Sequence, residues 1–414
     1  MRTNLHRLQQ DMETIAQYSS TAKGGTTRFT FTKEHELAKN YITAQMKAAG
    51  LTVRQDAAGT LIGRREGLEP GAAAVMTGSH FDTVRCGGNF DGVAGVVAGL
   101  EAARVMQEQQ IVTRRPLEFI AMVEEEGGRF GAALFASRAM AGEVTEQELQ
   151  SLKDSDGISI WDAMKNFGMD PTAVKEAVRK PENLHAFIEM HIEQGPILEA
   201  SKKDLGIVDV IVANRTLELT VIGHANHAGT TPMHMRTDAF VAAAQIAEAA
   251  MKEAIAVGEG TVATMGQMSV LPGSTNIIPG KVVFTLDIRS PKDELLDEIQ
   301  QKIQNHMKSL EEKGQILKGT LRPLPGAAAT KLDSHVMHLL EESADKLGFS
   351  RQRILSGAGH DAMVIANLTP TGMLFVPSKN GRSHCPEEWT DYEQLQKGCE
   401  TLLETLIALA NEKE

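Results

Sequence analysis

Four apolar segments of this chain are each followed at once by histidine or acidic residues. They span residues 72–77, 116–123, 184–190 and 371–376, and their apolar character predicts buried strands. In an open α/β sheet, ligands bind at the carboxyl ends of the strands, where loops can aim side chains without disturbing the core. The repeated arrangement therefore favours a fold in which four strand ends contribute to one polar site.

The strand ends carry side chains that suit a divalent metal. A lone histidine at a strand end is more often a hydrogen-bonded structural residue, and an acidic triplet such as 124–126 is more often a solvated turn. Repetition over four strands favours a metal site instead, because imidazoles and carboxylates are ligands of borderline ions such as Zn²⁺ and Mn²⁺. The predicted metal ligands are His80, Asp91, Glu126, His191 and His384.

The number of these ligands favours two ions over one. A single ion needs fewer ligands than the strand ends supply, so two ions that share a carboxylate fit better. Hydrolytic sites of this kind hold their ions about 3.5–4 Å apart with a water between them. A carboxylate that binds no metal, such as Glu125, is then needed to move the proton of that water to the leaving nitrogen. The pattern predicts a metal-dependent hydrolase.

The composition describes an acidic globular protein and argues against two kinds of partner. The 414 residues are 42% hydrophobic and 23% charged, with a formal net charge of −12. No basic stripe accompanies this charge and only 4% of residues are aromatic, so nucleic-acid binding is not expected. The absence of an apolar signal segment or membrane-length apolar run predicts a cytoplasmic protein without membrane contact. Cys86, Cys385 and Cys399 lack metal-finger spacing and indicate no disulfide framework.

The chain is long for one hydrophobic core, and its pattern of apolar and polar residues changes along its length. Alternating strands and helices up to about residue 135 are typical of a layered α/β domain. After Gly206 the pattern becomes β-α-β-β-α-β, with half-exposed strands, and predicts an inserted sandwich domain, residues 212–325, between 1–211 and 326–414. Further expected elements are helices at 33–50, 93–105, 238–255 and 292–313, and strands at 52–55, 61–64, 216–222 and 282–288.

Six segments in combination resemble the ureidohydrolase branch of the di-metal aminoacylase and carboxypeptidase superfamily, over nearly the whole chain. This branch includes allantoate amidohydrolase, N-carbamoyl-L-amino-acid hydrolase, a β-ureidopropionase and ureidoglycolate amidohydrolase. The resemblance implies a di-metal exopeptidase-like α/β catalytic domain, with a mixed sheet flanked by helices, and an inserted α+β lid and dimerisation domain. The matching segments are His80-Phe-Asp82, Gly88-Asn-Phe-Asp91-Gly92, Glu125-Glu126-Gly-Gly-Arg129-Phe130, His191-Ile-Glu-Gln194-Gly195, His227-Ala-Gly-Thr-Thr-Pro-Met233 and Ser383-His384-Cys-Pro386.

The resemblance also implies roles around two divalent ions, for which Mn²⁺ is expected ahead of Zn²⁺, Co²⁺ or Ni²⁺. Glu125 would be the general base, and Asp82 would orient the imidazole of His80. Peptidase relatives carry a carboxylate where this chain has His191, and the histidine marks the ureido-cleaving branch. One ion would be held by His80, Asp91 and His191, and the other by Asp91, Glu126 and His384, so that Asp91 bridges.

Several residues are expected to contact the substrate, which the resemblance implies is a small ureido acid. His227 would stabilise the developing oxyanion, and Gln194 would contact the carbamoyl group. Gly359, within the motif 356–361, is placed among the substrate-binding residues. The resemblance further implies a homodimer formed through the inserted domain, with His227 acting in its own subunit or in the neighbouring one.

Two arginines are expected at opposite ends of the substrate. By the resemblance, Asn276 and Arg289 grip the carboxylate, for which the planar guanidinium fork is suited. An ion pair with Asp287 is the structural alternative for Arg289. Arg215 falls where carbamoylases have an apolar residue, so it could hydrogen-bond the second ureido group of allantoate.

Local motifs lean toward allantoate as the substrate, whose cleavage would release ammonia and CO₂. Segments 229–233 and 356–361 resemble the allantoate enzymes, whereas 387–389 is closer to the carbamoylases. N-carbamoyl-L-amino acids are the main alternative, followed by ureidoglycolate and carbamoyl-β-alanine. A peptidase or aminoacylase, or an inactive binding protein of the same fold, is more remote. Cys86 and Cys385 depart from the residues usual in the branch, but neither removes a ligand.

Overall fold

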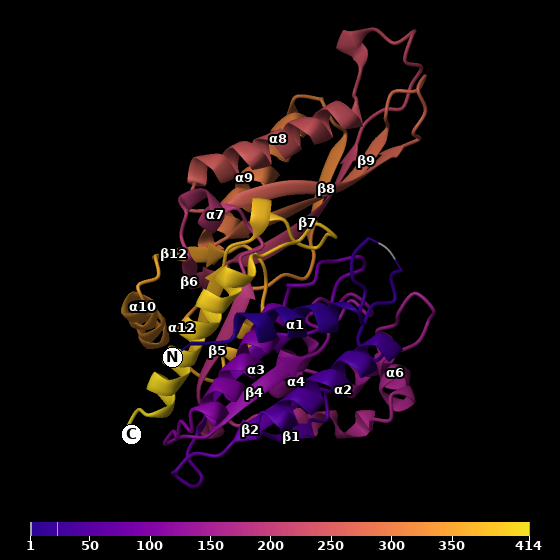
Figure 1. Ribbon diagram of the computed structural model, residues 1–414. Helices are drawn as coiled ribbons and strands as arrows, with labels where there is room; N and C mark the ends of the chain where they lie inside the picture. Colours follow the sequence, from indigo (N-terminus) through magenta and orange to yellow (C-terminus); the bar gives the residue numbers. More distant parts are fainter. Residues whose placement is uncertain (1, 23, 414) are drawn as a thin grey trace. The chain divides into compact units, whose positions relative to one another are not determined.

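The computed structural model describes residues 2–22 and 24–413. Their contacts divide the chain into two compact units. Unit 1 contains the residues up to Asp209 and those from Leu332 onward, and unit 2 is Val210–Lys331. The predicted inserted domain, 212–325, falls within unit 2. The chain thus leaves unit 1, forms unit 2, and returns (Figure 1).

The four strands that the sequence predicts to end at the site are adjacent to one another in the large sheet. Its order is β1-β2-β4-β3-β5-β13-β6-β11, and β12 also pairs with β6. β3 is parallel to β4 and β5, and β13 is parallel to β5, whereas the β1–β2, β2–β4 and β13–β6 pairs are antiparallel. The strands are β1 (Thr52–Gln55), β2 (Leu61–Arg65), β3 (Ala74–His80), β4 (Leu117–Met122), β5 (Leu184–Ile192), β6 (Leu205–Ile211), β11 (Thr330–Lys331), β12 (Arg351–Ser356) and β13 (Thr371–Val376).

Helices cover this mixed sheet, which confirms the predicted α/β class. β3, β4 and β13 are buried along their whole length, as expected for parallel strands covered on both faces. Among the covering helices, α3 and α12 pack on β3 and β5, and α2 packs on β1 and β2. The α-helices of unit 1 are α1 (Leu5–Ala16), α2 (Lys33–Ala48), α3 (Val93–Glu108), α4 (Phe135–Met140), α5 (Glu146–Ser151), α6 (Ile160–Asn166), α7 (Ile197–Ser201), α10 (Ser334–Leu347), α11 (Asp361–Ile365) and α12 (Tyr392–Ala410).

Local sequence explains where several of these elements begin and end. The side chains of Asn4, Thr32 and Asp333 accept backbone N–H bonds at the starts of α1, α2 and α10. Short 3-10 turns connect other elements: η1 (Pro171–Ala177), η2 (Pro181–Asn183) and η4 (Lys379–Gly381). None of the helices within residues 2–22 and 24–413 combines the length and the hydropathy needed to span a membrane.

Unit 2 has the β-α-β-β-α-β order expected from its sequence pattern. Its antiparallel sheet has the order β10-β7-β9-β8. α8 packs on β7, β8 and β9, and α9 packs on β9 and β10. The elements are β7 (Ala213–Ile222), η3 (Met233–Met235), α8 (Ala239–Val257), β8 (Val262–Leu271), β9 (Lys281–Ser290), α9 (Asp293–Glu312) and β10 (Lys318–Pro323).

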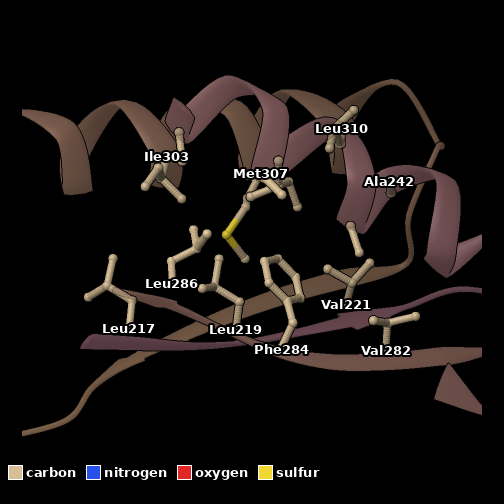
Figure 2. Close-up of a cluster of buried hydrophobic side chains, with 14 of the residues drawn as sticks. Leu217, Leu219, Val221, Ala242, Val282, Phe284, Leu286, Ile303, Met307 and Leu310 are labelled. Carbon is tan, nitrogen blue, oxygen red and sulfur yellow. The ribbon is translucent and has the colours of Figure 1, made fainter. Parts of the chain in front are cut away.

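Strand alternation builds the core of unit 2. Every second residue of β9 is buried, and β7 follows the same rule over Leu217, Leu219 and Val221. Figure 2 shows these side chains facing Ile303 and Met307 of α9. Removing this apolar face from water is what holds the two helices on one side of the sheet.

Candidate active site

The two buried histidines of the site lie at the ends of neighbouring parallel strands. His80 is the last residue of β3 rather than part of the loop after it, and His191 is the penultimate residue of β5. Nδ1 of His80 lies 3.2 Å from the carbonyl oxygen of Asp82, and Nδ1 of His191 lies 2.9 Å from that of Ile192. Donation from Nδ1 to a carbonyl leaves Nε2 of each ring as the ligand atom.

Asp91 lies between three histidines. Its Oδ1 atom is 3.2 Å from Nε2 of His80 and 3.1 Å from Nε2 of His191, while Oδ2 is 3.3 Å from Nε2 of His384. The next residue, Gly92, has a φ of 65°, and a Cβ there would overlap the imidazole of His80. Glycine at this position therefore lets the chain place Asp91 against both strand ends.

The five predicted metal ligands come together in unit 1. Oε1 of Glu126 lies 3.4 Å from Nε2 of His384 and has no hydrogen-bond partner within the described chain, although it is buried. Side chains that could hold an ion, with ligand atoms within 4.8 Å of one another, form three groups: His80, Asp91 and His191; Asp91, Glu126 and His384; and His80, Glu125 and Glu126. The first two groups coincide with the ligand sets implied by the resemblance.

The electrostatics of this cluster suit divalent cations. Burial, with the charge of Asp91 added, raises the pKa of Glu126 to about 7. Burial opposes ionisation of Asp91 as well, but His191, His384 and His80 hold its pKa well below the usual value. The bond to Asp91 raises the pKa of His384 to about 9. Imidazole nitrogens and carboxylate oxygens without thiolate are a donor set that fits Mn²⁺, Co²⁺ or Zn²⁺.

Glu125 lies beside the cluster, and Asp82 holds its backbone. Oε2 of Glu125 is 3.7 Å from Nε2 of His80, and burial raises the pKa of this carboxyl well above its usual value. The Asp82 carboxylate accepts N–H bonds from Glu125 at 3.2 Å and Glu126 at 3.3 Å, and stays 3.7 Å from Nδ1 of His80. The hydrogen-bond partner of His80 is thus the backbone carbonyl of Asp82, whereas the carboxylate positions the acidic turn.

The first acid of the triplet is a structural residue rather than a solvated one. Glu124 is 1% exposed and has a φ of 55°. Its Oε1 atom accepts N–H bonds from Arg129 and Phe130, which closes the turn after β4. Burial raises the pKa of Glu124 to about 7, and the charge of Asp82 adds to the effect.

Gln194 reaches the same cluster from the turn after β5. Its Nε2 atom donates to Oδ2 of Asp91 at 2.6 Å and lies 3.4 Å from Nε2 of His384. Its backbone has a φ of 56° and its N–H donates to Ser378. Within the described residues, Oε1 of Gln194 is buried without a hydrogen-bond partner, so its acceptor capacity remains for a ligand.

His227 and Asn276 lie together in unit 2. The N–H of Ala228 donates to the carbonyl of Asn276, and His227 forms a β-bridge with Ile277. Nδ1 of the exposed His227 accepts N–H bonds from Gly229 at 3.0 Å and from Thr230. Because Nδ1 is an acceptor in this arrangement, the proton of a neutral ring lies on Nε2, which can donate to an oxyanion.

Arg215 and Arg289, the two arginines expected to contact the substrate, lie on opposite faces of the sheet of unit 2. In the β7–β9 register, Arg215 faces Ile288 and Asn214 faces Arg289. Ile288 belongs to the core under the helices, so Arg215 shares the helix-covered face, where Nη1 donates to Asp297 at 2.6 Å and to Gln300 on α9. Directly opposed residues share a face and successive ones alternate, so Arg289 lies on the other face.

Arg289 forms the ion pair that was considered as its structural alternative. Its Nε and Nη2 atoms donate to the carboxylate of Asp287 at 3.1 and 3.0 Å. Both side chains remain about one-third exposed, at 36% and 33%. Gly359, the remaining predicted substrate contact, is exposed in unit 1 between β12 and α11. The substrate roles of these residues stay predictions.

Several buried polar residues beside the ligands were not singled out in the sequence. The ring of His360 packs 4.6 Å from that of His191 and its Nε2 lies 2.9 Å from the Ser356 hydroxyl. Glu189, within β5, accepts hydrogen bonds from Ser79 and from the Ala362 backbone. Glu189 could have been found from the sequence, because it is a charged residue inside an apolar strand, two positions before His191.

A mixed α/β sheet whose parallel strands end in clustered histidines and carboxylates is an arrangement that fits a metal-dependent hydrolase. Residues 76–408 match peptidase family M20/M25/M40, and the chain belongs to this family. Its similarity to named amidohydrolases places it in the branch of allantoate and N-carbamoyl-L-amino-acid amidohydrolases. It is therefore a hydrolase that acts on C–N bonds, in a family that is generally dependent on two metal ions.

The similar proteins favour one substrate class within this branch. The chain is 46% identical to an N-carbamoyl-L-amino-acid amidohydrolase of Paenarthrobacter aurescens, over 97% of both chains. It is 35% identical to the allantoate amidohydrolase of Bacillus subtilis, over 96% of both. A hydantoinase/carbamoylase-family amidase of Burkholderia multivorans has a similar structure, with a TM-score of 0.93 and 34% identity, covering 100% of this chain and 99% of that one. These identities support the carbamoyl amino acid alternative better than allantoate.

Proposed function

We propose that the protein hydrolyses N-carbamoyl-L-amino acids to the amino acid, ammonia and CO₂. Metal-dependent hydrolysis is supported above all by the two carboxylate oxygens of Asp91, which face different histidines. Oδ1 lies toward His80 and His191, and Oδ2 lies toward His384. A carboxylate shared in this way suits two divalent ions, of which Mn²⁺ is the first choice. When bound, such ions supply Lewis acidity and an activated water.

The residues around this centre supply binding and proton transfer. Glu125 belongs to neither of the two proposed ligand sets, and its carboxylate lies next to His80, so it is free to take the water proton and deliver it to the leaving nitrogen. Gln194 offers its amide to the carbamoyl group from its position beside Asp91. Nε2–H of His227 would donate to the oxyanion as negative charge develops.

The position of Arg215 supports the carbamoyl amino acid over allantoate. A role for Arg215 with the second ureido group was the physical reason to prefer allantoate. Its guanidinium is instead paired with Asp297 and Gln300 on the helix-covered face of unit 2. The named relatives with higher identity act, by their names, on N-carbamoyl-L-amino acids.

The arrangement of unit 2 supports a homodimer as part of the proposal. Lys281 and Arg289 are eight residues apart in β9 (289 − 281), which corresponds to about 26 Å along a strand. His227 and Asn276 lie in the loops beyond the Lys281 end, because Lys281 pairs with the last residues of β7 and β8 and these loops follow those residues. A small ureido acid cannot contact both ends at once. We therefore assign Arg289 to one subunit of each site, and His227 with Asn276 to the other.

A substrate panel tests this function. Ammonia release is measured from several N-carbamoyl-L-amino acids, allantoate, ureidoglycolate and carbamoyl-β-alanine, with Mn²⁺ or Zn²⁺ supplied after chelation. The highest kcat/KM is expected for an N-carbamoyl-L-amino acid, and metal-free protein should be inactive. A higher kcat/KM for allantoate would return the assignment to that substrate. Full activity of protein shown to be metal-free by elemental analysis would refute the di-metal site.

A further inference from the structure

A buried carboxylate outside the predicted ligand sets connects two of their members. Glu388 is 4% exposed and precedes α12. Its Oε1 atom accepts N–H bonds from Phe90 at 2.8 Å and Asp91 at 3.0 Å. Its Oε2 atom accepts from the Ser383 hydroxyl at 2.8 Å and from the N–H of His384 at 3.3 Å. One side chain thus joins the loop of Asp91 to the loop of His384, and its bond to Phe90 spans 298 residues of sequence.

The neighbouring chain is shaped around this carboxylate. A Cβ atom at Gly88 would overlap the Glu388 carboxylate, so the glycine allows the loop before Asp91 to close over it. The Ser383 hydroxyl also lies 2.9 Å from Oδ2 of Asp91, so its single proton is shared between the two acids. A buried carboxylate is costly unless it is hydrogen-bonded, and here backbone N–H groups donate to both oxygens of Glu388.

The two proposed ion sites differ in how firmly their histidines are held. His80 and His191 are each 1% exposed and lie within strands of the sheet. The side chain of His384 is 49% exposed, and its backbone is in the left-handed region with a φ of 56°. Its segment has no strand to fix it, so the bonds to Glu388 matter more there than at the strand ends.

We propose that Glu388 is a positioning residue that fixes His384 relative to Asp91 and thereby controls the affinity of the ion site formed by Asp91, Glu126 and His384. The proposal rests on the proposed di-metal function. The other site takes His80 and His191 from strands of the sheet, so Glu388 acts on only one of its three ligands, the shared Asp91, and this site should be affected less. Residues that hold metal ligands in place typically change metal affinity by about 10–100-fold when they are replaced.

Two substitutions and a neighbouring control separate this role from general stability. Glu388→Gln keeps the size of the side chain but leaves one acceptor oxygen, so it can satisfy only one of the two loops. Glu388→Ala removes both links. Glu387→Gln removes the adjacent carboxylate, which is exposed and paired with Arg382, and serves as the matched control.

Metal-free wild type and variants are titrated with Mn²⁺ by calorimetry and followed by electron paramagnetic resonance. Wild type and Glu387→Gln should bind two ions and give the signal of a coupled ion pair. Glu388→Gln should bind one ion with nearly wild-type affinity and the second about 10–100-fold more weakly, so that at intermediate Mn²⁺ the signal of an isolated ion remains. Melting temperatures of the metal-free proteins verify that the variants are folded.

The outcomes distinguish the role of Glu388 from the di-metal site itself. Two ions bound by Glu388→Gln with wild-type affinities would refute the positioning role and leave the proposed function intact. Equal weakening of both ions would refute it too, because the residue would then act on the whole site. A wild-type protein that binds no coupled pair would overturn the di-metal function, and with it this proposal. If Glu388→Ala does not fold, the Glu388→Gln titration decides.

Discussion

Oδ1 of Asp82 accepts a hydrogen bond from the backbone N–H of Glu125 at 3.2 Å. Oδ2 accepts from Glu126, so one carboxylate fixes two successive peptide groups of the acidic turn. Asp82 follows β3 and the glutamates follow β4, and these strands are parallel neighbours. The bond therefore holds the turn in the conformation that directs Glu125 toward His80 and Glu126 toward His384.

This division of the two glutamates predicts different effects of nearby substitutions. Glu125→Gln should lower kcat by about 10²–10⁴-fold with unchanged metal content, because it removes a base and keeps the ligands. Asp91→Ala should lose metal, since both proposed ions depend on it. Elemental analysis and steady-state kinetics of the two variants provide the measurement. Equal loss of metal in both variants would show that Glu125 is a ligand.

The opposite orientations of the two arginines predict different consequences for catalysis. Arg215→Leu should change kcat/KM for allantoate and for N-carbamoyl-L-amino acids alike, because its partners Asp297 and Gln300 belong to the scaffold of unit 2. Arg289→Ala should weaken the binding of every substrate that has a carboxylate. The loss should be about 2–5 kcal/mol if the pair of Arg289 with the substrate carboxylate is desolvated. Kinetics on both substrates check this. A loss confined to allantoate in Arg215→Leu would give Arg215 a substrate role.

The separation of His227 from Arg289 predicts active sites that need two subunits. Glu125→Gln and His227→Asn homodimers should each be nearly inactive. Co-expression of differently tagged copies should restore activity in the purified heterodimer, because one of its sites has both residues intact. β8 at the sheet edge and exposed apolar residues such as Val262 and Ile255 offer a surface for association. A fully active monomer by light scattering, or no activity in the heterodimer, would contradict this arrangement.

A buried histidine outside the proposed ligand sets predicts a pH dependence of stability. Burial lowers the pKa of His35 to about 3, and the charges of Lys39, Arg28 and Arg129 add to the effect. The unfolded chain takes up this proton below its ordinary pKa of 6.5, whereas the folded protein does not until about pH 3. The free energy of unfolding therefore falls as pH decreases from 6.5 toward 3, by about 2 kcal/mol at pH 5, and this contribution is constant above 6.5.

Melting of the metal-free protein tests this dependence without interference from metal loss. His35→Gln can still accept the N–H bond that Phe31 gives to Nδ1 of His35, but it does not titrate. The melting temperature of the variant should fall less between pH 7 and pH 5 than that of the wild type. Parallel curves for the two proteins would mean that His35 is not the group responsible.

Local patterns predicted the elements around the site well, because burial imposes a visible period on the sequence. The four largely apolar runs correspond to β3, β4, β5 and β13, and the β-α-β-β-α-β order of unit 2 is confirmed. Boundaries were less accurate: the first strand was expected at 72–77 and instead runs from Ala74 to His80. β6, β11 and β12 were not predicted. The apolar, β-branched run of β6 was a missed signal, whereas the two residues of β11 are defined as a strand by their pairing with β6.

The sequence by itself determined which ligand types would meet, because the four site strands are parallel neighbours in the sheet and their ends share an edge. It also carried the family resemblance that assigns roles to His80, Asp91 and His191. Only the tertiary structure decided which residues hold the proposed ligands in place. Whether the carboxylate of Asp82 bonds to a ring or to a turn, and whether Glu388 reaches Phe90, 298 residues before it, depends on how distant segments pack. Local periodicity holds no information about such distant contacts, because it reflects burial alone.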